Sequence, residues 1–261
     1  MILAHRAALD GIQMDEIDPA IVIQRIEEAA PKESIQAAAL AMGGSRITQK
    51  RRESLDVVIR FGIDVRKQEM ARREEIIEAV NRWAMRGGIL RISQKPERRL
   101  RVILVQAASV GDPWDWTANY SLTFRACGIP WWEQETPATA TGPVAASGSI
   151  DIQAEGSAET CAEVTLENMS GANIAMASIT IGGKTMSFSD LGLGGGERLV
   201  IDHDERGFLR IRIRNAGGTF RSAMAKRSGA DDFKVLPGAV SCSWSAQRAV
   251  QATVSVRGRF A

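Results

Sequence analysis

The stretch LDVVIRFGIDVRKQEMARREEIIEAVNRWAMRGG, residues 55–88, decides the fold of the first half of the chain. Its first eleven residues alternate in polarity, as in a strand that buries one face and leaves the other largely polar. The apolar positions are Leu55, Val57, Ile59, Phe61, Ile63 and Val65. Arg60 is on the polar face. We therefore predict a half-buried strand over 55–65.

The apolar period then changes from two to 3.6 with almost no loop between. Ile77, Val80 and Trp83-Ala84 fall on one stripe, and Arg and Glu alternate on the outer face. Gly87-Gly88 is a good helix stop. The pattern predicts a strand followed directly by one amphipathic helix.

More strands are predicted on either side of this pair. Residues 89–93, 99–107 and 119–129 alternate like strands, whereas 20–29 fits either a short strand or a helix. Gly43-Gly44 breaks the chain ahead of a predicted basic turn. The first half, 1–137, is thus expected to be an α+β domain with one helix on a sheet.

The composition changes beyond this point. Residues 138–148, ATATGPVAASG, are small and uncharged and predict a linker. From 149 to 261 no helical pattern occurs. Short strands alternate with Gly-rich and polar turns, at the spacing of an all-β sandwich. We therefore expect two domains, 1–137 and 149–261, joined by 138–148.

Composition excludes several classes of function. The formal net charge of the 261 residues is +2, and neither half carries a marked basic excess, as a nucleic-acid reader would. No stretch is long and apolar enough to span a membrane, and Asp10 lies where a signal peptide needs an apolar core. Three widely spaced cysteines, Cys127, Cys161 and Cys242, predict free buried thiols and neither a disulfide framework nor a zinc site.

No motif indicates catalysis. The segment IDHDERG, 201–207, fits either a divalent-cation loop or a polar hairpin turn; we favour the turn, because neighbouring strand residues point to opposite faces. GLGGGE, 192–197, lacks the Lys and the following helix of a phosphate loop and predicts a turn. We predict no catalytic, cofactor-binding or metal-binding residue, and no enzyme.

What remains is surface. A dense basic cluster fits either a solvated turn that protects a strand edge or a contact with an acidic partner or passing DNA. Four tryptophans close to the end of the first half fit either core or interface, and we favour interface. The candidate interface residues are Arg46, Lys50, Arg51, Arg52, Arg60, Trp114, Trp116, Trp131 and Trp132.

The order of the parts is distinctive. It runs from GSRI (44–47) through the strand 55–65 and the helix 73–85 to a strand ending in two tryptophans, YSLTFRACGIPWW (120–132). The second half adds NMSGANIAMASITIGG, GERLVIDHDERG and DFKVLPGAVSCSWSAQRAVQATVSVRGRF. From about Gly43 to its end, the chain resembles the distal tail proteins (Dit) of long, flexible-tailed bacteriophages. The first forty residues fit this pattern less closely.

The resemblance implies a structural protein of the virion tail tip. In that family the first domain packs into a hexameric ring around a channel, and a galectin-like β-sandwich projects outward. The implied partners are copies of the chain, the tail tube protein, the tail-tip hub, and tape-measure and receptor-binding proteins, with DNA only in transit and no membrane insertion. On this hypothesis an edge strand at 54–65 suits pairing across subunits.

The alternative function is a carbohydrate-binding module that uses the second domain. Sugar sites usually present an exposed aromatic ring, and Trp244 is a candidate. Trp244 shares its strand parity with Val240 and Cys242, so we favour a core position. A hydrolase, the third class, would need a convergent polar pocket that no sequence pattern indicates.

Overall fold

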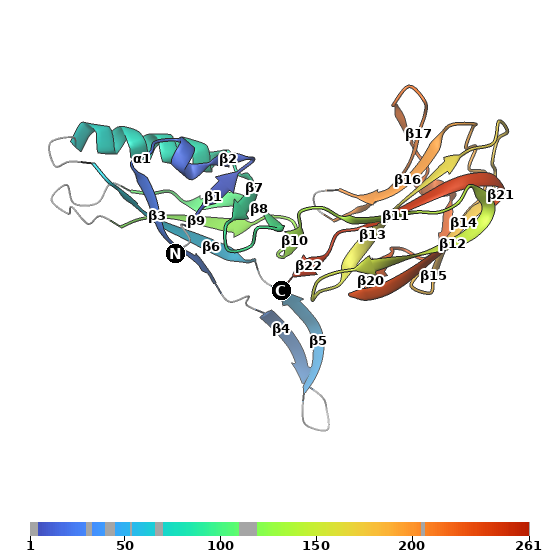
Figure 1. The fold of residues 1–261 in the computed structure, drawn as a ribbon. Coiled ribbons are helices and arrows are strands. Elements are labelled where there is room, and N and C mark those ends of the chain that lie inside the picture. Colours follow the sequence, from blue (N-terminus) through green and yellow to red (C-terminus); the bar gives the residue numbers. More distant parts are fainter. Residues whose placement is uncertain are drawn as a thin grey trace. The chain divides into compact units, whose positions relative to one another are not determined.

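The computed structural model describes residues 5–29, 33–39, 45–52, 54–65, 70–109, 119–204 and 207–260. The chain divides into two compact units, Met1–Trp132 and Glu133–Ala261 (Figure 1). This division precedes the boundary predicted at 137. Strand β10 (Trp132–Gln134) spans it in sequence.

The first unit is built on an antiparallel sheet in the order β2-β1-β7-β8-β9-β6-β3. A short 3-10 helix, η1 (Met14–Glu16), precedes β3. The strands are β1 (Ala7–Leu9), β2 (Ile12–Gln13), β3 (Ile21–Glu28), β6 (Asp56–Ile63), β7 (Gly88–Ile92), β8 (Arg98–Gln106) and β9 (Tyr120–Ala126). The ambiguous segment 20–29 is therefore a strand.

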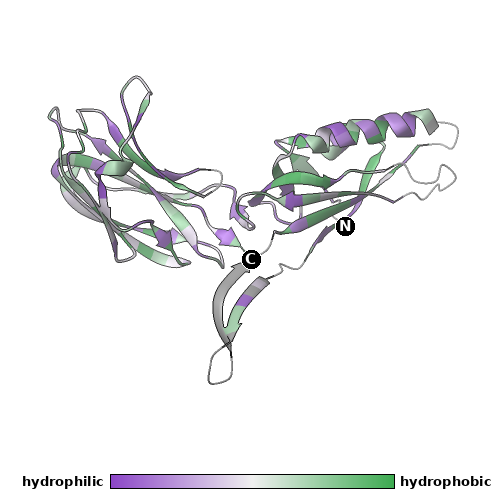
Figure 2. Cartoon of the chain, turned by 180° about the vertical axis from the view of Figure 1, so that it is seen from behind, coloured by the Kyte–Doolittle hydropathy of each residue, from purple (hydrophilic) through white to green (hydrophobic). Residues whose placement is uncertain are grey.

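Helix α1 (Met70–Met85) packs on this sheet, as predicted. Ile77, Val80 and Trp83 are buried, and the Trp83 ring meets Phe124 of β9 edge-on at 6.1 Å between centroids. Figure 2 shows hydrophilic and hydrophobic bands alternating along the helix, as its amphipathic sequence requires. None of the helices in the described ranges is long and apolar enough to cross a bilayer.

The predicted strand at 55–65 is confirmed, but its place in the sheet differs from expectation. Leu55, Val57, Ile59 and Phe61 are buried. β6 pairs with β3 on one side and β9 on the other, so it is an internal strand. The expectation that it pairs across subunits as an edge strand is wrong, because both of its edges are already hydrogen-bonded within the chain.

The predicted basic turn is also corrected. Residues Ser45–Arg52 form strand β5, which pairs with β4 (Glu33–Ala39) in a separate two-stranded antiparallel sheet. The charged residues of this run suggest a turn, because the sequence gives no sign of a strand that could pair with them. That partner is supplied by residues 33–39, a segment that has no clear strand signal of its own.

The second unit is a β structure in the order β18-β17-β16-β13-β21-β14-β15-β19. Its strands are β11 (Ala138–Thr141), β12 (Ala145–Ala154), β13 (Thr160–Asn168), β14 (Ala177–Ile181), β15 (Lys184–Phe188), β16 (Arg198–His203), β17 (Leu209–Arg214), β18 (Phe220–Ser222), β19 (Arg227–Gly229), β20 (Lys234–Val235), β21 (Gly238–Val256) and β22 (Arg259–Phe260). A 3-10 helix, η2 (Met224–Lys226), lies between β18 and β19.

Strand β21 is the spine of this unit. Its first part, residues 238–246, lies between β12 and β14, and its last part, 250–256, lies between β11 and β13. Val240, Cys242 and Trp244 from the first part and Val254 from the second all enter one core. A single long strand therefore organises most of the second unit.

The predicted linker at 138–148 is wrong. Ala138–Thr141 is strand β11 and Ala145 begins β12, and both pair with β21. Two of these residues are glycines that lie against a large ring: a β-carbon added to Gly142 would come within 2.3 Å of the Trp244 indole, and one added to Gly148 within 2.5 Å. At these two positions the lack of a side chain is required by packing and does not indicate a linker.

Candidate functional site

The hairpin β4–β5 is separate from the main sheet of the first unit. It lies in sequence between β3 and β6, two strands that pair with each other. Among the described strands, β4 and β5 pair only with one another, and β3 has β6 as its sole partner. The hairpin and the outer edge of β3 therefore have strand edges with no partner among the described strands, and such edges can pair with another chain.

The four basic candidates of the predicted turn all lie in β5. Their paired positions in β4 are Ala38 for Arg46, Ile35 for Lys50, Ser34 for Arg51 and Glu33 for Arg52. The residues 33–52 contain four basic residues and one acidic residue. The hairpin therefore carries an excess of positive charge and has the composition to meet an acidic surface.

Arg60, the fifth basic candidate, is engaged inside the sheet. Its Nε lies 3.2 Å from Oε1 of Glu27, on the neighbouring strand β3, and half of its side chain is exposed. Arg125 makes a two-pronged contact with Asp56, at 2.7 and 2.9 Å, and this hydrogen bonding raises the pKa of Arg125. The polar face of the sheet is thus a set of internal ion pairs, which does not single out Arg60 as a contact for a partner.

Trp132 is not at the surface. Its side chain is 1% exposed, and its Nε1 donates a hydrogen bond to Oε2 of Glu28 at 2.9 Å. Lys95 contacts the same carboxylate at 2.6 Å and lies 4.9 Å from the centre of the indole. This burial overturns the preference for an interface at Trp132; the ring completes the core of the first unit. Trp131 is half-buried, and Trp114 and Trp116 lie outside the described residues.

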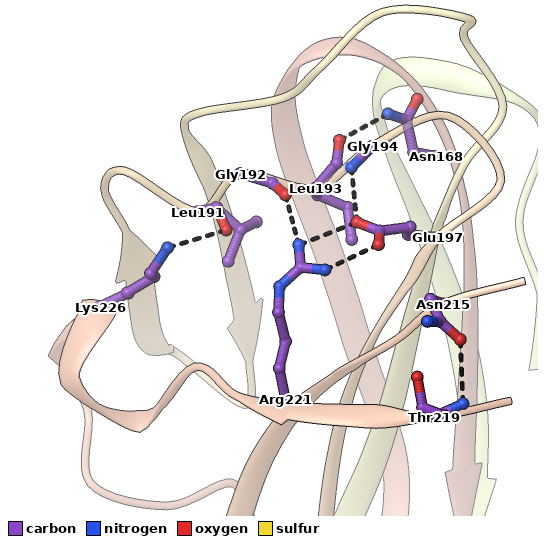
Figure 3. A network of polar contacts seen from close by, with 10 residues as sticks. All are labelled: Asn168, Leu191, Gly192, Leu193, Gly194, Glu197, Asn215, Thr219, Arg221 and Lys226. Atoms are coloured by element: carbon purple, nitrogen blue, oxygen red, sulfur yellow. Dashed lines mark hydrogen bonds and ion pairs between the residues drawn. The ribbon is translucent and has the colours of Figure 1, made fainter. Parts of the chain in front are cut away.

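The GLGGGE segment is a turn, as predicted. The side chain of Glu197, the last residue of the segment, folds back onto the glycine loop (Figure 3). Glu197 accepts a hydrogen bond from the backbone N–H of Gly194 at 2.7 Å and two from Arg221 at 2.7 and 2.8 Å. Arg221 also donates to the carbonyl of Gly192. The hydrogen bonds from Arg221 are the main cause that lowers the pKa of Glu197. The glycine loop binds a carboxylate of this chain, which leaves no cradle for a phosphate.

Two more side chains fix the same loop. Asn168, which is buried, donates to the carbonyl of Leu193 at 2.8 Å, and Lys226 donates to that of Leu191 at 3.2 Å (Figure 3). These contacts come from β13 and η2, elements far apart in sequence. The loop is therefore held in place by hydrogen bonds from several parts of the second unit.

Trp244 is in the core, as its parity predicts. It is 3% exposed and shares the interior with Val240 and Cys242. All three cysteines are free, and burial raises the pKa of Cys242 to about 12. Cys161 is only half-buried; burial first, and then the nearby Asp232 carboxylate, raise the pKa of its thiol.

The strands on either side of the predicted turn, β16 and β17, pair antiparallel as a hairpin requires, and residues 205–206 lie outside the described residues. His203 pairs with Leu209 across β16 and β17, and Asp202 binds Arg210 and Arg212. The His203 ring points to a residue that the sequence does not bring near it: its Nε2 lies 2.8 Å from Oδ1 of Asp232. This contact joins positions 29 apart, so no local pattern indicates it.

Comparison with known proteins identifies the architecture. No protein-family model and no curated protein sequence matches the chain. Among solved structures it is similar to the Dit protein (gp 19.1) of phage SPP1, described as a paradigm of the hub adsorption apparatus in phages that infect Gram-positive bacteria. The TM-score is 0.69 at 14% identity, over 98% of this chain and 99% of that chain.

Chains of the phage p2 baseplate in its activated conformation are also similar, more remotely. The TM-score is 0.50 at 6% identity for the form with Ca, over 99% of this chain and 98% of that chain. For the form with Sr it is 0.48 at 6% identity, over 97% of each chain. At such identities the likeness concerns the fold. The resemblance predicted from the sequence is confirmed at that level: over nearly its whole length this chain has the fold of the SPP1 Dit protein.

Proposed function

We propose that this chain is a structural protein of a phage tail tip, where it forms a hexameric ring that joins the tail tube to the hub. In this proposal the first unit, Met1–Trp132, forms the ring around a central channel through which DNA passes. The second unit, Glu133–Ala261, is a galectin-like sandwich on the outside. The role is one of assembly, with no catalytic step.

One observation carries the proposal: the fold is shared with the SPP1 Dit protein from end to end, across both units. A likeness limited to the second unit would fit any β-sandwich module. A likeness that includes the first unit supports the ring-forming role that the sequence resemblance implies.

The internal position of β6 changes how the ring is expected to close. Among the described strands of the first unit, the unpaired edges are those of the two-residue strand β2, of β3 and of the β4–β5 hairpin, and the last two are the longer ones. We propose that neighbouring subunits meet there, with the basic residues Arg46, Lys50, Arg51 and Arg52 near the contact. Arg60 and Trp132 take internal partners, and so they have no place in this proposed contact.

Carbohydrate binding is the second candidate, and the exposed aromatic ring that it requires is that of Phe220 and not that of Trp244. Trp244 is buried, but Phe220 is 49% exposed beside a hollow of about 260 Å³ that Arg210 and Met224 also line. Arg212 lies 4.3 Å from the centre of the Phe220 ring, so one ring face is already covered. That leaves less of the ring for stacking on a sugar.

The test is electron microscopy of the purified chain, with its mass measured in solution over a range of concentrations. Six-fold rings with a central hole and outward lobes are the expected result. Tails assembled with a tagged chain give the second readout, with the tag expected at the distal end. A chain that stays monomeric and is absent from purified tails would contradict the proposal, and a glycan array would then test the second candidate.

A further inference from the structure

Three side chains of different chemistry converge in the second unit. They are the thiol of Cys161 at the start of β13, the imidazole of His203 at the end of β16, and the carboxylate of Asp232 just before β20. One ligand atom from each can be chosen so that all lie within 4.8 Å of one another. Among the described residues, this is the one group of three or more such side chains that is close enough to share an ion.

The cluster is not an exposed patch of charge. The His203 side chain is 7% exposed, and all three residues are at least partly buried. The second ring nitrogen of His203, Nδ1, is buried with no hydrogen-bond partner. The nitrogen that faces the carboxylate is Nε2, so Nε2 is the ring atom that can bind an ion at the cluster, whereas Nδ1 points to a different side of the ring.

The detailed geometry fits metal coordination better than a nucleophilic triad. In a triad the histidine lies between the thiol and the acid and hydrogen-bonds to both. Here the carboxylate is in the middle: Oδ1 of Asp232 lies 2.8 Å from Nε2 of His203, and Oδ2 lies 3.9 Å from Sγ of Cys161. The Asp232 carboxylate therefore contacts both other groups, whereas in a triad the imidazole would do so.

We propose that Cys161, His203 and Asp232 bind a zinc ion. Zinc takes thiolate, imidazole and carboxylate ligands in tetrahedral geometry, with bonds of about 2.0–2.3 Å. Ligand atoms at such bond lengths lie about 3.5 Å apart. The distances of 2.8 and 3.9 Å involve the two different oxygens of Asp232; with one ligand atom from each residue, all three lie within 4.8 Å of one another, so shifts on the order of 1 Å bring them onto one ion.

The ion would act as a cross-link. β13 and the segment before β20 already meet through the backbone, where the N–H of Ala162 donates to the carbonyl of Phe233 at 2.9 Å. Zinc would add the end of β16 to this contact and leave a fourth coordination position for water. All three residues belong to the second unit, so the zinc site can be tested independently of the proposed hexameric ring.

Cobalt(II) titration of the full chain, stripped with a chelator, tests the site. The expected result is one equivalent of Co²⁺ with a thiolate-to-cobalt absorption band in the near ultraviolet and tetrahedral bands in the visible, both abolished by added Zn²⁺. Cys161→Ser should remove the near-ultraviolet band, and His203→Gln should weaken zinc binding by more than about 100-fold.

Controls separate this site from accidental binding. Cys127→Ser and His5→Gln change the other partly buried thiol and the only other histidine, and should leave the spectrum unchanged. Asp232→Asn keeps the shape and a hydrogen-bond acceptor for His203, so it tests the charge without removing the contact. Absence of stoichiometric Co²⁺ binding by the folded wild-type chain, or bands that persist in Cys161→Ser, would overturn the proposal.

Discussion

Gly148 lies opposite Trp244 across the antiparallel pair β12–β21, and a β-carbon on Gly148 would lie 2.5 Å from the indole ring. The Trp244 Nε1 also lies 3.4 Å from the carbonyl of Ala145. The run of small residues at 138–148 is therefore a bed for this ring. The lack of a side chain at Gly142 and Gly148 lets the chain at these two positions lie close to the Trp244 ring.

Substituting Gly148 tests this packing. Gly148→Ala should destabilise the second unit by about 1–3 kcal/mol, because a rigid ring cannot move away from an added methyl group in a filled core. Gly171→Ala is the matched control, since no atom lies within 4 Å of its added β-carbon. Urea unfolding measures both free energies. Equal stability of the two variants would mean that the ring is not held against Gly148.

The Glu197–Arg221 pair should make the free energy of unfolding of the second unit depend on pH. The pKa of Glu197 is lowered in the folded state, so its contribution is full above the unfolded value of about 4.3 and is lost as pH falls through the folded pKa. Glu197→Gln should cost about 1 kcal/mol at pH 7 and progressively less below about pH 4. Melting temperatures of both chains from pH 3 to 7 check this. A difference that does not shrink in acid would contradict it.

The cysteines should differ in reactivity. Cys242 is fully buried with a pKa of about 12, so a thiol reagent at pH 8 should modify it only after unfolding. Cys127, which is half-buried, should react in the folded chain. Because the folded pKa of Cys242 is above the unfolded value of about 8.5, it lowers stability as pH rises above that value. Mass spectrometry of labelled peptides reads out each site, and rapid labelling of Cys242 in the native chain would contradict its place in the core.

Charge reversal on the hairpin tests the proposed assembly surface. Arg51→Glu with Arg52→Glu should lower particle yield at least tenfold in a complementation assay while the melting temperature changes little, because β5 pairs only with β4 among the described strands. Arg82→Glu with Arg86→Glu, at exposed positions near the end of α1, reverses the same charge elsewhere in the first unit. Normal yield from the hairpin variant, or the same loss from both variants, would count against the hairpin as the contact.

Local periodicity was sufficient for much of this fold. The alternation at 55–65 and the 3.6-residue stripe of the following helix depend only on which side chains face the core, so β6 and α1 were predictable. The parity of Val240, Cys242 and Trp244 placed Trp244 inside for the same reason. The order of these parts was enough to indicate the Dit-like architecture.

Tertiary structure decided what depends on distant partners. Residues 138–148 have no periodicity, and Ala138–Thr141 and the residues from Ala145 on form strands that pair with β21. β6 became internal because β3 and β9 flank it, and the predicted basic turn became β5 because 33–39 pairs with it. Cys161, His203 and Asp232 come from three separate parts of the sequence, so their spacing in the sequence does not predict that they lie together. The sequence alone determined which faces of the strands and of the helix are apolar. The neighbours of each strand and the side chains that converge depend on long-range pairing. The free energy of that pairing depends on residues far apart in sequence, so a local pattern does not predict it.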